Sequence, residues 1–323
     1  MKAIRVHQTG GPEVLRWEDV PLGDPGPGEA RVRHIAVGLN FVDVYYRTGL
    51  YKAPSLPFTP GSEAAGVVEA VGAGVSDLRP GMRVAYGSAP MGSYAEARLV
   101  PADRVVPIPE GIGDRTAAAM MLKGMTAHYL LHRTVQVKAG DVILLHAAAG
   151  GVGLILAQWA RALGATVIGT VGSDEKAALA RAHGCEHVIV YTRERFVDRV
   201  KEITAGAGVR VVYDSVGRDT FQGSLDTLRP LGMMALFGQS SGPVTAFDPA
   251  LLSRASLFLT RPSLFHYVAA REDLLAAAKA LFDVVRSGKV KVEVRQTYPL
   301  AEAARAHADL ESRRTTGSTV LLP

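Results

Sequence analysis

The sequence is poor in cysteine and has no long hydrophobic run. Its one cysteine, Cys185, cannot form a disulfide within the chain and fits a reducing compartment. The position of Cys185 before a short apolar segment favours a packing role over a reactive thiol. No apolar stretch is long enough to span a membrane, and residues 1–15 lack the apolar core of a signal peptide. We therefore expect a cytoplasmic protein that does not insert into a membrane.

Long blocks of one charge are also missing. Lys and Arg number 36 and Asp and Glu number 31, which gives a net charge of +5, and the two signs are interspersed throughout. A nucleic-acid partner is therefore not favoured, and an anionic ligand accounts for the mild excess of positive charge. The 323 residues, 48% of them hydrophobic, indicate a globular chain of two domains.

One segment, 141–169, carries the strongest local pattern. An apolar run, a small-residue turn, an amphipathic segment and a second β-branched run follow one another. This order predicts the strand–turn–helix–strand unit that holds a dinucleotide pyrophosphate at a helix N-terminus. Gly150 would let the backbone approach the phosphates, and Gly153 would let the helix pack close to the strand. A turn without a ligand is the less favoured interpretation in this context. The candidate cofactor residues here are Ala148, Gly150, Gly151, Val152 and Gly153.

The end of the second strand bears on the choice of cofactor. An NADH site usually has a carboxylate there, whereas this chain has none before the turn at 169–173. Asp174 comes late, where Ser173 or Asp174 would cap the next helix. The missing acid removes repulsion against a 2′-phosphate, and Lys176 adds positive charge. The segment therefore predicts NADPH rather than NADH, with a solvated surface lysine as the alternative for Lys176.

The chain changes character along its length. Up to about residue 110, short apolar runs are broken by glycine and proline, which predicts a β-barrel-like domain. A helix is expected over 117–131, with a possible break at Gly124. From residue 141, strands and helices alternate, which predicts a doubly wound parallel sheet. The expected strands are 142–146, 166–170, 187–190, 209–213, 233–238 and 256–260, and the helices are 152–163, 174–183, 194–204 and 219–228.

The last elements most economically rejoin the first domain. They are a helix over 271–287, a strand over 291–298, a helix over 300–311 and a strand over 318–322. We therefore predict one domain of residues 1–124 and 265–323, and a second domain of residues 125–264.

Several ordered motifs resemble one protein family. The chain is similar from end to end to the zinc-independent NADPH:quinone oxidoreductase branch of the medium-chain dehydrogenase/reductases, which includes the zeta-crystallins. Its late segments are especially similar to the bacterial members. The resemblance implies a GroES-like β-barrel catalytic domain and a Rossmann domain that binds NADPH. It also implies a homodimer, formed through the edge strand at 256–260. The motifs are GGPEVL near the start, GLNFVD at 38–43, PGSEAAGVV at 60–68, HAAAGGVG at 146–153 and VVYDSVG at 211–217, followed by FGQSSGPVT, TRPSL and AHADLESRRTTGS.

The zinc-using relatives differ at informative positions. In the alcohol dehydrogenases a cysteine stands where this chain has Asn40, and a histidine where it has Ser62. A structural zinc with four cysteines is impossible with one cysteine, and His128 and His132 lack a third ligand nearby. We therefore expect no metal, and we interpret Glu63 as a buried structural partner.

The resemblance also implies the site residues. It places Asn40, Tyr45, Tyr51 and Thr126 around the nicotinamide and the acceptor. Asn40 would bond the carboxamide or the ribose, and Tyr45 or Tyr51 would stack on a quinone or donate to it, unless they only line the barrel wall. Asp214 is either near the ligand or a helix cap, and Arg261 either holds a phosphate or bridges the domains. The remaining candidates are Gly172, Ser173, Lys176, Tyr191 and Arg313 at the 2′-phosphate, and Phe237, Gly238 and Ser240 along the nicotinamide ribose.

Without zinc, the acceptor must itself be electrophilic. A quinone or an α,β-unsaturated carbonyl meets this condition because it is conjugated. The leading hypothesis is an NADPH:quinone oxidoreductase that works in the interdomain cleft, with no obligatory general acid. One alternative is an NADPH-dependent reductase of activated C=C bonds in alkenals, enones or enoyl thioesters. The other is a non-catalytic, crystallin-like protein that binds NADPH or RNA.

Overall fold

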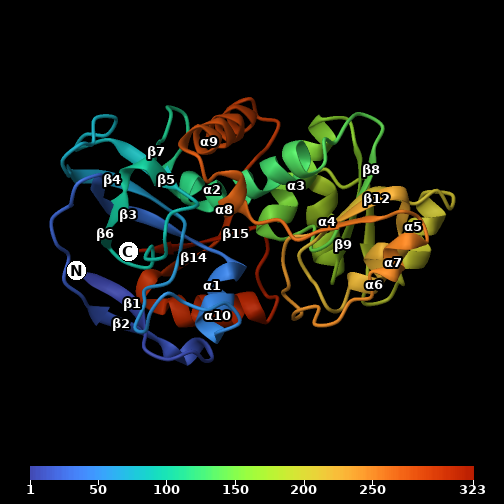
Figure 1. The fold of residues 1–323 in the computed structure, drawn as a ribbon, viewed down its shortest axis with the longest axis horizontal. Coiled ribbons are helices and arrows are strands. Elements are labelled where there is room, and N and C mark those ends of the chain that lie inside the picture. Colours follow the sequence, from blue (N-terminus) through green and yellow to red (C-terminus); the bar gives the residue numbers. More distant parts are fainter. The chain divides into compact units, whose positions relative to one another are not determined.

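The strand that comes last in the sequence pairs with one of the earliest in this computed structural model, which describes residues 1–323. These strands are β15 (Ser318–Leu322) and β3 (Glu29–Leu39). The chain forms two units (Figure 1), and the early and late parts of the sequence build the first one together. The first unit comprises Met1–Met125, Val268–Arg286 and Val292–Pro323, and the second comprises Thr126–Tyr267 and Ser287–Lys291.

The first unit is built on a seven-stranded sheet and a separate two-stranded sheet. The larger sheet has the order β14-β15-β3-β4-β5-β7, and β6 also pairs with β3. Alternate residues of β3 face the core, so that Ala30, Val32 and Ala36 are fully buried. Only β14 and β15 run parallel, and the other pairs are antiparallel. The remaining strands are β1 (Lys2–Val6), β2 (Leu15–Asp19), β4 (Ala64–Val71), β5 (Arg83–Tyr86), β6 (Ala97–Pro101), β7 (Val106–Pro107) and β14 (Val294–Pro299).

Four helices accompany this sheet, and one of them corrects a prediction. Helix α2 runs unbroken through Gly124 and is followed by a π-helix, η3 (Leu130–Thr134). A Cβ at Gly124 would lie 2.4 Å from a methyl carbon of Leu281, so the glycine allows α2 to pack closely on α9. The expected break at Gly124 is therefore wrong. The helices are α1 (Phe41–Thr48), α2 (Asp114–Tyr129), α9 (Arg271–Arg286) and α10 (Ala303–Glu311), with short 3-10 turns η1 (Pro12–Val14), η2 (Ala102–Arg104) and η4 (Leu300–Glu302).

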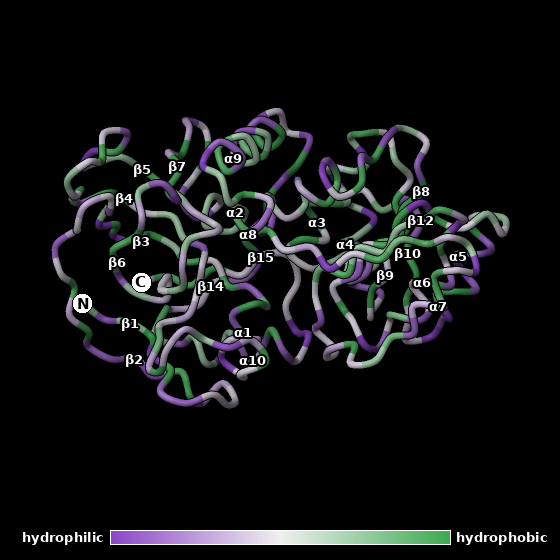
Figure 2. Tube along the Cα trace, viewed as in Figure 1, coloured by the Kyte–Doolittle hydropathy of each residue, from purple (hydrophilic) through white to green (hydrophobic).

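The second unit is a six-stranded parallel sheet with the order β10-β9-β8-β11-β12-β13. Numbered from the first strand of the unit, this is the order 3-2-1-4-5-6 of a Rossmann sheet. The strands are nearly continuous apolar runs, as Figure 2 shows, because helices cover both faces of such a sheet. The predicted doubly wound sheet is thus confirmed. The strands are β8 (Val142–Leu145), β9 (Thr166–Val171), β10 (His187–Val190), β11 (Val209–Asp214), β12 (Leu228–Leu236) and β13 (Phe258–Thr260).

The helices of the second unit follow the predicted alternation, with one difference. The helix expected over 219–228 is shorter, and β12 begins earlier than expected. Leu228 already pairs with Val209, and the register then shifts at a bulge, where Leu231 has a φ of 61°. A β-bulge places extra residues on one strand, so Leu228 can pair with Val209 before the regular register of β12 begins at Met233. The helices are α3 (Gly151–Ala162), α4 (Asp174–Ala182), α5 (Phe196–Ile203), α6 (Phe221–Asp226), α7 (Ala250–Ser253) and α8 (Leu264–Tyr267).

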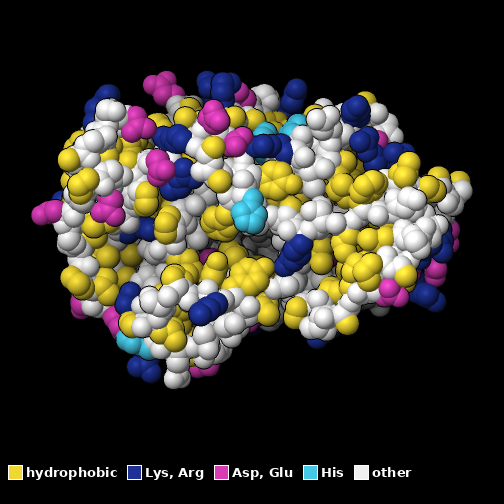
Figure 3. Space-filling model, in the orientation of Figure 1, with side chains coloured by type: hydrophobic (Ala, Val, Ile, Leu, Met, Phe, Trp, Pro, Cys, Tyr) yellow, Lys and Arg dark blue, Asp and Glu magenta, His cyan; other side chains and the backbone are white.

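Surface charge is mixed. On the face drawn in Figure 3, basic and acidic side chains are scattered among one another and do not form one large patch. None of the helices combines the length and the apolar character that crossing a bilayer requires.

Candidate functional site

The glycine turn of the second unit joins β8 to the N-terminus of α3. Gly150 is the N-cap of α3, and no side chain caps the helix there. A Cβ at Gly153 would lie 2.4 Å from the carbonyl oxygen of Ala147, so only glycine lets the helix start so close to the turn. The first amides of α3, at Gly151 and Val152, therefore lie at a helix end that no side chain occupies, and the residues fit a bound pyrophosphate.

The next strand end gathers the residues predicted for a 2′-phosphate. Ser173 is the N-cap of α4, and its Oγ accepts the amide of Lys176 at 3.3 Å. A Cβ at Gly172 would lie 2.8 Å from the hydroxyl oxygen of Tyr191, so this phenol stands directly over the turn. Asp174 is exposed and pairs with Arg193 instead of capping the helix. The turn thus presents hydroxyls and a lysine, and of the two carboxylates that begin α4, Asp174 is paired with Arg193 and Glu175 is exposed.

A third group of residues follows β11 and β12. The amides of Phe237 and Gly238 donate to the carbonyl oxygen of Asp214, at 2.8 and 3.3 Å, and the amide of Ser240 donates to Ser215. Strands β8, β9, β11 and β12 are close neighbours in one parallel sheet, so their carboxyl ends meet at one edge. The structure therefore brings the predicted residues of the second unit to a common edge, with the glycine turn between β8 and α3 near its middle.

Asp214 is resolved as a structural carboxylate. It is fully buried, and its two oxygens accept four hydrogen bonds, which use all the acceptor positions of a carboxylate. The carboxylate holds the loop before α6, but it does not cap this helix, whose N-cap is Thr220. The donors are the amides of Val216 (2.7 Å) and Gly217 (3.0 Å) and the hydroxyls of Thr220 (2.7 Å) and Ser224 (2.8 Å).

In the first unit, Asn40 is held by two carboxylates. It lies between β3 and α1, and its backbone amide donates to Asp43 Oδ2 at 2.9 Å. Its side-chain nitrogen donates to Glu63 Oε2 at 2.8 Å. Glu63 is completely buried and also accepts from the amide of Leu122 and the ammonium of Lys123, each at 2.8 Å. The interpretation of Glu63 as a buried structural partner is confirmed, and the amide oxygen of Asn40, which faces the backbone amide of Asp43 in a capping box, keeps one lone pair for a ligand.

The two predicted tyrosines lie side by side. The rings of Tyr45 and Tyr51 have centroids 5.1 Å apart in an edge-to-face arrangement, and the amide of Tyr51 donates to the carbonyl oxygen of Tyr45. Phe41 packs against Tyr45 from one helical turn away, with the rings tilted and 5.5 Å between their centroids. Tyr45 is largely buried in this aromatic group, whereas Tyr51 is partly exposed.

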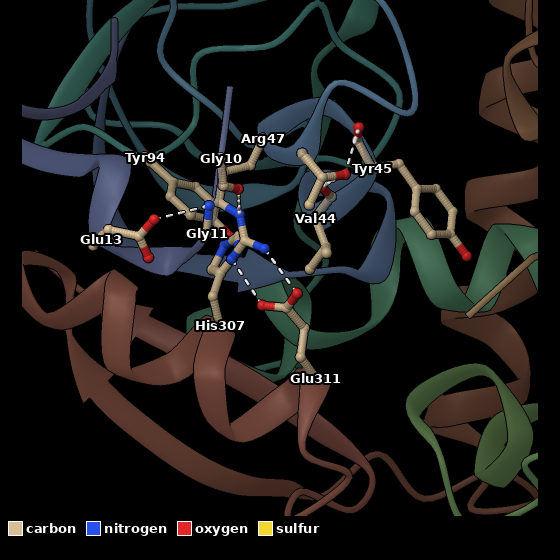
Figure 4. A network of polar contacts seen from close by, with 10 residues as sticks. Gly10, Gly11, Glu13, Val44, Tyr45, Arg47, Tyr94, His307 and Glu311 are labelled. Carbon is tan, nitrogen blue, oxygen red and sulfur yellow. Dashed lines mark hydrogen bonds and ion pairs between the residues drawn. The ribbon is translucent and has the colours of Figure 1, made fainter. Parts of the chain in front are cut away.

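A buried network fixes α1, the helix that carries Phe41 and Tyr45 (Figure 4). Arg47 is fully buried, and its guanidinium binds both oxygens of Glu311 at 2.8 Å. It also donates to Nδ1 of His307, so that the proton of this imidazole is on Nε2 and is donated to Tyr94. Tyr94 in turn donates to Asp43 at 3.0 Å. Every hydrogen of the chain from Arg47 to Asp43 is therefore assigned by geometry.

Burial dominates the acid–base behaviour of this network. Burial raises the pKa of Asp43 to about 7, although hydrogen bonds from Asn40 and Tyr94 oppose the shift. Burial, followed by the charge of Arg47, lowers the pKa of His307 to about 3. At neutral pH the imidazole is thus neutral, as its acceptor role toward Arg47 requires.

Three further predicted residues belong to other elements of the chain. Thr126 lies within α2 and is buried. Arg313 follows α10 in the first unit, is exposed and has a φ of 61°. Arg261 donates to the carbonyl oxygen of Leu236 at 2.7 Å, within the second unit. His128 and His132 have ring centroids 5.1 Å apart, and no group of three or more metal-ligating side chains is present.

Sequence reasoning missed Lys123 and the network of Arg47. Lys123 had a usable signal, because it is the only charged residue in the otherwise apolar and small-residue stretch 116–127. The partners of Arg47 had none, because 264 positions separate it from Glu311.

Comparisons with known proteins agree with this geometry. The family model of the alcohol dehydrogenase GroES-like domain matches residues 26–110, and that of the zinc-binding dehydrogenases matches residues 151–283. A quinone oxidoreductase of Pseudomonas aeruginosa is 51% identical, over 100% of this chain and 99% of its own. A 2-haloacrylate reductase of a Burkholderia species is 49% identical, over 99% and 98%. The solved structure of Escherichia coli quinone oxidoreductase complexed with NADPH has a TM-score of 0.98 at 48% identity and covers 100% of both chains. The predicted GroES-like and Rossmann fold class is confirmed.

Proposed function

Because this chain belongs to the quinone oxidoreductase branch of the medium-chain dehydrogenase/reductases, we propose that it is an NADPH-dependent quinone reductase. The observation that carries the choice of cofactor is the turn after β9. It offers Ser173, Lys176 and Tyr191, it has no carboxylate before α4, and Asp174 at the start of α4 is paired with Arg193. A 2′-phosphate is attracted to such a turn and would be repelled by the acid of an NADH site.

The two units have separate roles in this proposal. The uncapped N-terminus of α3 binds the pyrophosphate, with Ala148, Gly150 and Gly153 shaping the turn. Phe237, Gly238 and Ser240 line the nicotinamide ribose, and Arg313 adds charge at the 2′-phosphate. We assign residues 1–124 and 265–323 to the catalytic domain and residues 125–264 to the cofactor domain.

The catalytic residues orient the reactants. NADPH, when bound, supplies the hydride. Asn40 presents its amide oxygen to the carboxamide or the ribose because Glu63 holds the nitrogen of the same amide. Tyr45 and Tyr51 contact the acceptor, and Thr126 contacts the nicotinamide. The network of Arg47 keeps α1, and with it Asn40 and Tyr45, in one position.

A second candidate function is the reduction of activated C=C bonds. The relative named 2-haloacrylate reductase is almost as similar to this chain as the quinone oxidoreductases are. Both functions need the same cofactor and an acceptor that conjugation makes electrophilic. They differ in whether a quinone or an unsaturated acid, aldehyde or thioester is turned over.

One assay separates these functions. NADPH oxidation is followed with 1,4-benzoquinone, with 2-chloroacrylate, with an alkenal and with an enoyl thioester, at matched concentrations. We expect the highest kcat/KM with the quinone. A higher value with any of the other acceptors would replace the quinone as substrate. Binding of NADPH without turnover of any acceptor would leave only a non-catalytic role.

We further propose that the chain forms a homodimer through β13. This three-residue strand is at the edge of the parallel sheet, so its outer amides and carbonyls have no strand partner. Phe258, the first residue of β13, is 53% exposed. Leu231 is 69% exposed, and its amide donates to Ala255 near the same edge. Pairing of two such edges would cover both side chains.

Sedimentation analysis tests the dimer. Phe258→Lys places a charge at the edge and should yield monomers at concentrations where the unaltered protein is dimeric. Phe265→Lys, on α8 and also exposed, is the matched control and should leave the mass unchanged. A monomeric unaltered protein would contradict the proposal.

A cytoplasmic location, which the single cysteine favours, is checked by cell fractionation.

A further inference from the structure

A buried ammonium in the first unit has fewer partners than its chemistry requires. The side chain of Lys123 is 6% exposed, and its Nζ lies 2.8 Å from Glu63 Oε2, which is its one acceptor. An ammonium has three N–H donors. Leaving buried donors without acceptors is costly, so the position of Lys123 calls for a further acceptor that a ligand can provide.

Glu63 has no capacity to turn toward another group. Its Oε1 accepts the amide of Leu122, and its Oε2 accepts both Asn40 Nδ2 and Lys123 Nζ. The carboxylate is therefore fixed from three directions and completely buried. It acts as a clamp that sets the positions of the two nitrogen atoms bound to it.

The clamp places Lys123 beside Asn40. Both nitrogen atoms are 2.8 Å from the same carboxylate oxygen, so they are at most twice that distance apart. The amide of Asn40 keeps an oxygen for a ligand, and the ammonium of Lys123 keeps N–H groups. An acceptor and a charged donor are thus presented next to each other, at a position where the sequence already predicts a catalytic residue.

We propose that Lys123 is a further catalytic residue, whose ammonium donates a hydrogen bond to the carbonyl oxygen of the electron acceptor. Negative charge develops on this oxygen when a conjugated carbonyl is reduced, and a fixed cationic donor in a dry site stabilises that charge more than it stabilises the neutral ground state. The ligand class is a carbonyl conjugated to a C=C bond. Glu63 is a positioning residue for both Lys123 and Asn40. This inference rests on the proposed reductase activity.

The competing explanation is that Lys123 only neutralises Glu63. Removing the lysine alone would then impair the protein by leaving a buried carboxylate unpaired, whatever its role in catalysis. A variant that removes both charges separates the two explanations. In E63Q/K123M no charge is left unpaired and the methionine fills the space of the lysine stem; the amide oxygen accepts from Asn40, whereas the hydrogen bond from the amide of Leu122 is lost because the amide nitrogen takes the place of Oε1.

Four proteins are compared with the unaltered enzyme: K123M, E63Q/K123M, a second neutral pair E63Q/K123L in case the first does not fold, and the control K279M. Lys279 lies on α9 and is largely exposed. Thermal unfolding, NADPH affinity by fluorescence titration, and kcat and KM with 1,4-benzoquinone are measured. The affinity of each protein for the quinone in the absence of NADPH is measured as well.

We expect both the single and the double variant to lose about 10- to 100-fold in kcat/KM, the effect of one charge-assisted hydrogen bond. Affinity for the quinone alone should fall less than kcat, because the carbonyl oxygen gains its charge only on reduction. The double variant should regain the thermal stability that K123M loses and retain the affinity for NADPH. The control should match the unaltered enzyme throughout.

Two outcomes overturn the inference. If a folded neutral pair has kcat/KM within threefold of the unaltered enzyme, Lys123 is only a counter-ion. If NADPH affinity falls as much as kcat/KM, Lys123 acts on the cofactor and not on the acceptor. Failure of the proposed function is seen separately, as the absence of turnover of every conjugated carbonyl by the unaltered enzyme.

Discussion

The two units hold their polar groups by different means. In the second unit, the groups at the strand ends are backbone amides and side chains from the same few positions, as when Ser173 caps the amide of Lys176. In the first unit, side chains meet across the whole sequence, as Arg47 and Glu311 do. A site made of local backbone can be recognised in a sequence and tolerates the loss of single side chains. A site made of distant side chains is hidden in the sequence and depends on each charge.

The largest effect on stability is expected in the first unit, where distant charged side chains depend on one another. Glu311→Gln removes the charge that Arg47, itself fully buried, binds with two hydrogen bonds. Leaving the guanidinium without its counter-ion should reduce the free energy of unfolding by about 3 kcal/mol. Urea denaturation gives this value. Asp283→Asn, which breaks the exposed pair with Lys279, is the control and should change it by less than about 0.5 kcal/mol. Equal losses in the two variants would remove the distinction between the units.

In the second unit, we expect Lys176 to be the side chain that contributes most to NADPH binding. Lys176→Ala should weaken NADPH binding by about 1.5–3 kcal/mol, the value of a charge-assisted hydrogen bond, and leave NADH binding nearly unchanged. Fluorescence titration with both nucleotides measures the difference. Lys201→Ala, on the exposed face of α5, serves as the control. If both nucleotides lose equally, Lys176 does not contact the 2′-phosphate.

The pH dependence of the free energy of unfolding provides a third test of the difference between the two units. Burial, followed by the charge of Arg47, lowers the pKa of His307 from 6.5 to about 3. Its neutral form therefore contributes stability that is complete above pH 6.5 and is lost as the pH falls toward 3. The free energy of unfolding of the unaltered protein should fall by about 2 kcal/mol more than that of His307→Gln between pH 7 and pH 5.

Urea denaturation of both proteins at the two pH values measures this difference. The pKa of Asp43, which burial raises to about 7, contributes stability that is complete below pH 3.8 and is lost as the pH rises through 7. That opposite trend occurs in both proteins, so the difference between them isolates the imidazole. Parallel losses with pH would show that His307 becomes charged within the folded protein.

The smallest effect is expected at Cys185. The thiol is buried in the second unit, and burial raises its pKa to about 12. Since the thiolate is the reactive form, a disulfide reagent should not modify the folded protein at neutral pH, whereas the protein in urea should react fully. Rapid labelling of the folded protein would mean that this part of the second unit opens readily.

The comparison also explains how much the sequence could reveal. The order of strands and helices and the turn with Gly150 and Gly153 were predictable because short segments of sequence encode them. The resemblance supplied Asn40 and led to the interpretation of Glu63 as a buried partner, but it did not supply the contacts of Glu63 with Asn40 and Lys123. Those contacts depend on how β3, β4 and α2 are placed in space, which no local pattern records. Gly124 shows the same limit, since the glycine that looked like a helix break serves a contact with Leu281, far along the chain.

The position of β15 has a consequence for how the protein is made. A ribosome releases residues 1–125 and then the complete parallel sheet before it releases the strand that must enter between β14 and β3. The inserted unit can therefore finish its core on the nascent chain, while the sheet around it stays incomplete until translation is almost over. We expect stalled nascent chains of increasing length to protect β8 to β13 from protease well before they protect β3.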